Sequence, residues 1–188
     1  MSTRCKINKL RFRGKQSTLK SKKSRPNYTR KKEMVKRRTR ARIAQVRNAG
    51  FEDATFFPWR DVGNVFLSRI RPNIGRQHAR FEVAPNRSAS LTQLVFPGRP
   101  GPTAWYRLIF FANSPSTTGV LQVSLLGTLH PGRVIPLLNI PTSRYQMFSI
   151  TFPASALRGR SSFELEFRVN AGARIGILNL DTVVIVPV

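Results

Sequence analysis

Lysine and arginine are the most densely clustered functional side chains in this chain of 188 residues. Residues 1–47 contain 19 lysines and arginines against one acid, Glu33, for a net charge of +18, whereas residues 48–188 carry 14 cations against 7 acids, a net of +7. Cations at this density bind polyanions by releasing counterions, with steep salt dependence and little sequence preference. We predict that the polyanion-binding residues are Arg11, Arg13, Lys22, Lys23, Arg30, Lys31, Lys32, Lys36, Arg37, Arg38, Arg40, Arg42 and Arg47.

The charge alone leaves the identity of the polyanion open. Nucleic acid, an acidic surface polymer, a phosphorylated protein and an anionic membrane all suit a basic segment. A solvated charge run that keeps an adhesive module soluble is the alternative, but the cation density far exceeds what solubility needs. Every lysine lies at or before Lys36, and the cations of residues 48–188 are all arginines, which can bind carboxylate or phosphate bidentately.

Side chains that could catalyse a reaction are few and scattered. His78 and His130 lie far apart in the sequence, and Cys5 lies in the basic segment without an oriented base. Glu164 and Glu166 share one face of an expected strand, but nearby Arg160 and Arg168 indicate an exposed, salt-bridged edge. Phosphate-binding glycine loops and clustered Cys/His ligands are absent from the sequence. We therefore expect a protein that is not an enzyme.

Two segments must position these residues. Residues 1–47 read as a basic arm, with residues 1–28 disordered and a basic amphipathic helix over about 29–47, where Val35, Ile43 and Val46 fall near one face. Residues 48–188 read as one compact domain, since a chain of this length accommodates one core plus an extension. The lone Cys5 excludes an internal disulfide framework.

The domain reads as all-β, a single jelly-roll β-sandwich preceded by the basic, partly helical arm. The clearest strand alternates strictly, with Phe163, Leu165 and Phe167 on one face and glutamates on the other. Short strands separated by Pro-Gly and Ser-Pro turns are typical of a sandwich, and helix should be scarce past Gly50. The expected strands are 64–70, 78–83, 88–96, 104–113, 120–126, 134–138, 144–152, 162–169 and 173–186.

Two of these segments are apolar on both faces: 105–112 (WYRLIFFA) and 178–186 (LNLDTVVIV). A strand buried on both faces needs a cover on each. Either a neighbouring subunit covers one face, or both segments lie in the middle of the sandwich under loops.

The ordered motifs of the domain resemble the carbohydrate-binding-module-like jelly rolls of bacteria, the NGGFE-type modules of spore-forming species. The resemblance is carried in order by residues 48–52 (NAGFE), 58–59 (PW), 106–112 (YRLIFFA) and 180–183 (LDTV). It implies a structural calcium ion on Glu52 and Asp181, although Thr182 stands where a second Asp is usual. The alternative pairs Glu52 and Asp181 with arginines. Sugar binding in such modules uses exposed aromatic residues, but Trp59 and Trp105 both read as core.

These observations support three functions. The first is a structural protein that self-assembles through its jelly roll, as in a spore-surface or parasporal layer, with the arm on a polyanion or a neighbouring subunit. The second is a small icosahedral viral capsid protein whose arginine-rich arm packages RNA. The third is a monomeric carbohydrate- or nucleic-acid-binding module.

No apolar run is long enough for a membrane span, and the first residues, MSTRCK, lack the apolar region of a secretion signal. We therefore expect synthesis in the cytoplasm and deposition in a spore-surface layer or, in the second reading, in a virion.

Overall fold

The computed structural model describes residues 46–97 and 104–188. The predicted disordered segment and helix of the arm, Cys5, and all predicted polyanion-binding residues except Arg47 lie outside the described residues. At Arg47 the backbone N–H donates to the side chain of Gln93 and the carbonyl accepts from it, each at 2.9 Å. The side chain of buried Gln93 therefore holds the backbone of Arg47, where the basic arm joins the domain.

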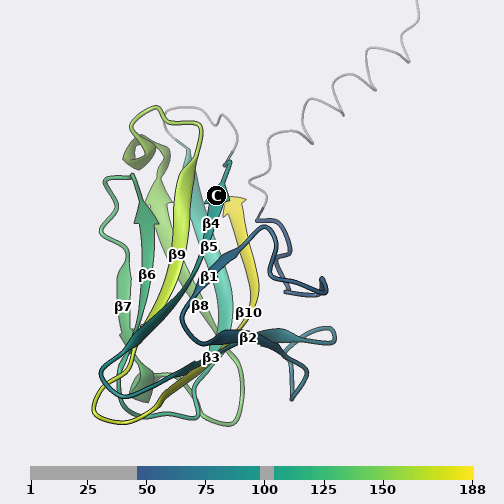
Figure 1. Cartoon of the computed structure of the whole chain (residues 1–188). Coiled ribbons are helices and arrows are strands. Elements are labelled where there is room, and N and C mark those ends of the chain that lie inside the picture. Colours follow the sequence, from purple (N-terminus) through teal and green to yellow (C-terminus); the bar gives the residue numbers. More distant parts are fainter. Residues whose placement is uncertain (1–45, 98–103) are drawn as a thin grey trace, which may run out of the picture.

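Two antiparallel five-stranded sheets form the domain (Figure 1). The first sheet has the order β1-β4-β9-β6-β7, built from Arg60–Val62, Ser88–Val95, Phe163–Asn170, Val120–Leu126 and Arg133–Pro136. The second has the order β2-β3-β10-β5-β8, built from Val65–Ser68, His78–Val83, Gly176–Pro187, Trp105–Asn113 and Gln146–Pro153. Two short 3₁₀ helices, η1 (Leu137–Asn139) and η2 (Ala154–Leu157), complete the elements. The predicted all-β sandwich and the scarcity of helix past Gly50 are confirmed for the described residues.

The core lies between the sheets, where inward positions alternate along every strand. In β9, Phe163, Leu165, Phe167 and Val169 are buried, as the alternation predicts. Trp59 is also buried, with its ring against Phe51 and Phe167 and its indole N–H donating to a backbone carbonyl. The expectation for Trp105 is wrong: as the first residue of β5 it points away from the core and stays 49% exposed.

Strands β10 and β5, the segments predicted to be apolar on both faces, lie side by side within one sheet. Their inner residues are fully buried against the other sheet. Their outer residues Ile109, Phe111, Val184 and Val186 are only half-buried, so loops cover that face incompletely.

Strand β9 corrects one expectation. It is the central strand of its sheet, so Glu164 and Glu166 do not lie on an edge. Glu166 is buried and pairs with Arg168 at 2.8 Å. Glu164 pairs with Arg60 of β1, a strand that the sequence did not predict, and not with Arg160.

Among the described residues, no helix has the length and hydropathy of a membrane span.

Candidate functional site: a cationic pocket over the second sheet

Three polar residues form a row across the outer face of the second sheet. Cross-strand pairing places Asn179 of β10 opposite Arg80 of β3 on one side and Asn113 of β5 on the other. Asn179 Nδ2 donates to Asn113 Oδ1 at 2.6 Å, and the Arg80 guanidinium lies 3.5 Å from Asn179 Oδ1. Each residue alternates with core residues such as Leu178 and Leu180, so the pleat fixes all three side chains outward.

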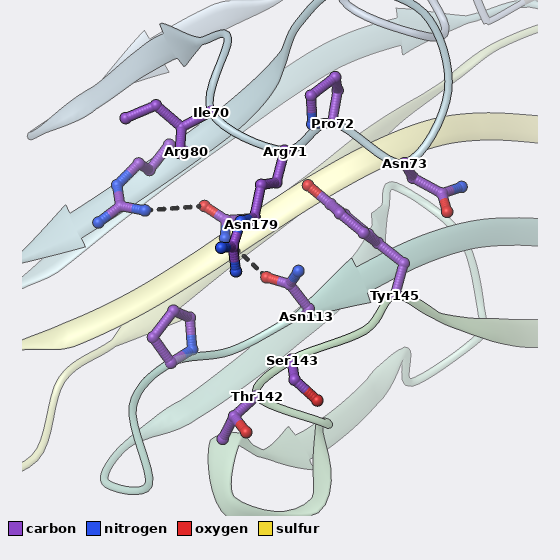
Figure 2. Close-up of a pocket in the computed structure, with 11 residues that line it drawn as sticks. Ile70, Arg71, Pro72, Asn73, Arg80, Asn113, Thr142, Ser143, Tyr145 and Asn179 are labelled. Atoms are coloured by element: carbon purple, nitrogen blue, oxygen red, sulfur yellow. Dashed lines mark hydrogen bonds between the residues drawn. The ribbon is translucent and has the colours of Figure 1, made fainter.

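Two loops rise over this row and enclose a pocket of about 320 Å³, here named the loop pocket. The β2–β3 loop supplies Arg71 and Asn73, and the segment before β8 supplies Ser143 and Tyr145. Figure 2 shows these side chains around the row, with the Tyr145 hydroxyl on the side of Arg71 and with Ser143 and Thr142 on the opposite side. The complete lining is Ile70, Arg71, Pro72, Asn73, Arg80, Asn113, Pro115, Thr142, Ser143, Tyr145 and Asn179.

Carboxylates outside the pocket fix the β2–β3 loop. Asp181 Oδ2 accepts the backbone N–H groups of Asn73 and Ile74, at 2.8 and 3.2 Å. On the other side, Glu52 accepts the N–H groups of Arg76 and Gln77, at 3.0 and 3.3 Å. We call Glu52 and Asp181 the loop clamp.

Gly75 makes the loop clamp possible. Its φ is +80°, and a Cβ atom there would lie 2.2 Å from Glu52 Oε1. Only glycine lets the backbone approach this carboxylate so closely.

The loop clamp bears on the calcium that the family resemblance implies. Calcium requires a shell of oxygen ligands, whereas here backbone N–H donors point at both carboxylates. The described residues also contain no group of three or more His, Cys, Asp or Glu side chains that could hold a metal. These donors fit a hydrogen-bonded clamp and do not fit a calcium shell. The alternative pairing with arginine side chains is not what the structure shows, since the donors come from the backbone.

Buried ionisable groups support the floor of the pocket. His78 is fully buried, and its Nε2 lies 3.1 Å from Asn179 Oδ1 while its ring packs edge-on against Tyr145. Because Asn179 Oδ1 can only accept, the network assigns the proton to Nε2. Burial lowers the pKa of His78. Desolvation also raises the pKa of Asp181, although the two backbone N–H bonds oppose this shift.

Two polar atoms of this region have no partner. His78 Nδ1 and Tyr145 Oη are buried without a hydrogen bond within the described part of the chain. Burial raises the pKa of Tyr145, so its hydroxyl remains a donor at neutral pH. Buried polar groups are nearly always satisfied, and an exception needs an explanation.

Two arginines line the pocket, and only one of them, Arg80, is paired with a carboxylate in the described residues. Neither Asp nor Glu is among its lining residues, and Arg71 makes no salt bridge within residues 46–97 and 104–188. Arg80 bonds Glu82 through Nε at 2.7 Å, so this bond and the contact with Asn179 use two of its five guanidinium donors. The arrangement can bind a polar ligand with acceptor oxygens.

Catalysis does not follow from this geometry. His78 has no exposed surface, so its imidazole does not reach the pocket, and His130 is occupied elsewhere by the N–H of Gly132 at 3.0 Å. The sequence reasoning did not identify the residues of the loop pocket. A signal existed for two of them, because Asn113 and Asn179 are polar residues within the two strands, β5 and β10, whose sequences are apolar on both faces.

Comparison with solved structures places the fold among carbohydrate-binding modules. The chain is similar to TmCBM61 in complex with β-1,4-galactotriose, with 18% identity over 74% of this chain and 95% of that one and a TM-score of 0.56. It is also similar to a CBM4 module, with 14% identity over 77% of this chain and 100% of that one and a TM-score of 0.53. The predicted jelly roll of this type is thereby confirmed, whereas the NGGFE grouping remains a prediction.

The same fold also occurs in an enzyme. A Stig cyclase from Fischerella sp. TAU, solved with an indole compound, shows 16% identity over 78% of this chain and 98% of that one, with a TM-score of 0.55. A scan against protein-family models and a search of curated proteins find no match. At these identities the likeness establishes the fold, and function has to be argued from the site.

Proposed function

We propose that this protein is a non-enzymatic binding module that holds a saccharide in the loop pocket, while its basic arm attaches to a polyanion. One observation carries the proposal: Arg80, Asn179 and Asn113 converge from three adjacent strands under Tyr145. Binding sites typically combine a preformed hollow with a few precisely placed polar groups. Carboxamides, hydroxyls and an aromatic ring match the hydroxyls and the apolar face of a sugar. Solved relatives in fold bear the name carbohydrate-binding module, which supports the same reading.

The opposite outer face, on the first sheet, is a poorer saccharide site. Its central glutamates are already paired with Arg60 and Arg168. Its outward positions on β4, β9 and β6 hold Ser, Thr, Gln, Leu, Glu, Arg, Val and Asn, without an aromatic ring.

A binding assay on the full chain tests the proposal. Isothermal titration with short oligosaccharides should give saturable binding that Asn113→Ala weakens. Ser124→Ala on the first sheet serves as the matched control and should leave the affinity unchanged. Binding that survives Asn113→Ala unaltered, or that Ser124→Ala abolishes, would place the ligand elsewhere.

Self-assembly is a second candidate, favoured by the apolar residues beside the pocket. Trp105 and Met147 are 49% and 58% exposed on the outer face of β5 and β8, next to half-buried Ile109 and Phe111. Exposed apolar patches often mark interfaces. We expect a second copy to cover this face once a polyanion has neutralised the arm, whose net charge of +18 otherwise repels like chains.

Sedimentation velocity with and without a polyanion tests this second candidate. Assembly that appears only with polyanion and is lost in Trp105→Ser would support it, whereas a monomer under both conditions would contradict it. A spore-layer role and an RNA-packaging role are both forms of this candidate. Nuclease treatment separates them, because only shells built on RNA should dissolve.

A further inference from the structure

The loop pocket has features that a neutral sugar does not require. Two guanidinium groups line it: Arg80 is paired with Glu82, whereas Arg71 makes no salt bridge among the described residues. None of the lining side chains is acidic. A neutral hydroxyl gains little from a full positive charge, whereas a carboxylate forms charge-assisted hydrogen bonds that are about twice as strong as neutral ones. The guanidinium of Arg71, which has no carboxylate partner among the described residues, therefore favours an anionic ligand over a neutral ligand of the same shape.

The donors also have the right form for a carboxylate. Arg71 makes no salt bridge among the described residues, and Arg80 retains unused N–H groups after bonding Glu82 and Asn179. Figure 2 shows both side chains on the same side of the pocket, on the flank of β3 and the β2–β3 loop. Guanidinium groups bind carboxylates bidentately, which fixes the orientation of the ligand as well as adding affinity.

The remaining groups suit the rest of a sugar acid. Ser143 and Thr142 lie away from Arg71 in Figure 2, with Asn113 between them and Asn179, and all three side chains can exchange hydrogen bonds with ring hydroxyls. Tyr145 contributes a ring and a buried hydroxyl that has no partner in the described residues. A volume of about 320 Å³ is at the small end of ligand pockets, which suits one or two sugar rings.

From these observations we infer that the loop pocket selects a saccharide bearing a carboxylate, that is, a uronic acid, with Arg71 and Arg80 holding the carboxylate and Asn113 and Tyr145 holding the ring. This inference rests on the proposed function and names its ligand class. The basic arm and the loop pocket could then bind the same polymer, since a polymer of uronic acids is itself a polyanion.

The test compares digalacturonic acid with its dimethyl ester, which retains the saccharide and removes both charges. Titration of the full chain in about 0.15 M salt limits binding by the arm, because exposed charges are screened beyond about 8 Å. We expect the acid to bind roughly tenfold to a hundredfold more tightly than the ester, as charge-assisted hydrogen bonds imply. Arg71→Gln with Arg80→Gln should remove most of that difference, whereas Arg107→Gln, exposed on β5 outside the pocket, should not.

The outcomes separate this inference from the proposed function. Equal affinity for acid and ester, with loss in Asn113→Ala, would overturn the uronic acid and leave saccharide binding intact. If the affinity for digalacturonic acid is unchanged in the variant with both Arg71→Gln and Arg80→Gln, the basic arm binds the carboxylate and the inference is overturned. Failure of both ligands to bind would overturn the inference and count against the proposed function. If the double variant unfolds, Arg71→Gln alone replaces it, because Arg71 is exposed on a loop and its substitution does not disturb the sheet.

Discussion

The outer faces of the two sheets differ in how far their polar groups are satisfied. On the first sheet, Glu166 pairs with Arg168 and Glu164 with Arg60. On the second sheet, Tyr145 Oη and His78 Nδ1 have no hydrogen-bond partner within residues 46–97 and 104–188. The same sandwich thus presents one face that is electrostatically complete and one with unused hydrogen-bonding capacity. A ligand in the loop pocket does not reach His78, which has no exposed surface, but it can pair with Arg71, which makes no salt bridge among the described residues.

The largest expected effect on stability comes from the centre of the polar row. Asn179→Ala removes the partner of Asn113 and of buried His78, so the free energy of unfolding should fall by about 2–3 kcal/mol. Ser124→Ala, an equally buried outward position on the first sheet with one weak side-chain bond, should cost less than about 1 kcal/mol. Urea denaturation of both variants measures the difference, and equal losses would mean that the two faces are alike.

The loop clamp should matter next. Asp181→Ala leaves the N–H groups of Asn73 and Ile74 without their acceptor, so we expect a loss of about 1–2 kcal/mol and weaker ligand binding through a displaced Arg71. Hydrogen exchange should show faster exchange confined to residues 69–77. If the variant retained both the exchange rates and the affinity, Asp181 would not position this loop.

Calcium offers a sharper test of the same residues. Because Glu52 and Asp181 accept backbone N–H groups, adding millimolar calcium or removing it with a chelator should leave the melting temperature unchanged. A rise in melting temperature that Glu52→Gln abolishes would show that the calcium implied by the family resemblance does bind.

The smallest change that we expect to be measurable concerns pH. Burial lowers the pKa of His78 in the folded state, so the folded protein favours the neutral imidazole. Stability from this group is therefore complete above the unfolded value of 6.5 and declines as the pH falls below it. His78→Gln should flatten the decline between pH 7 and about pH 5 in thermal denaturation. An unchanged slope would show that another group controls the acid sensitivity.

The sequence predicted the fold better than the site, for physical reasons. Strict alternation in β9 and the apolar runs of β5 and β10 report burial directly, so strands and core follow from local patterns. The loop pocket depends on which strands become neighbours. Asn113 and Asn179 are 66 positions apart and meet only because β5 pairs with β10.

Trp105 shows the limit of pattern reading within a single strand. Its apolar neighbours indicated core, but a strand that is apolar on both faces does not reveal which residue faces inward. The resemblance singled out Glu52 and Asp181 as a pair of calcium ligands. The backbone N–H groups that they accept instead depend on the path of residues 69–77, which no local sequence pattern encodes.

A crystal structure of the full chain with digalacturonic acid would show directly whether the loop pocket holds a sugar acid. We expect the sugar in the loop pocket, with its carboxylate on Arg71 and Arg80 and its ring beside Tyr145. A sugar bound across the first sheet, displacing the pairs at Glu164 and Glu166, or an empty loop pocket at saturating ligand, would contradict it.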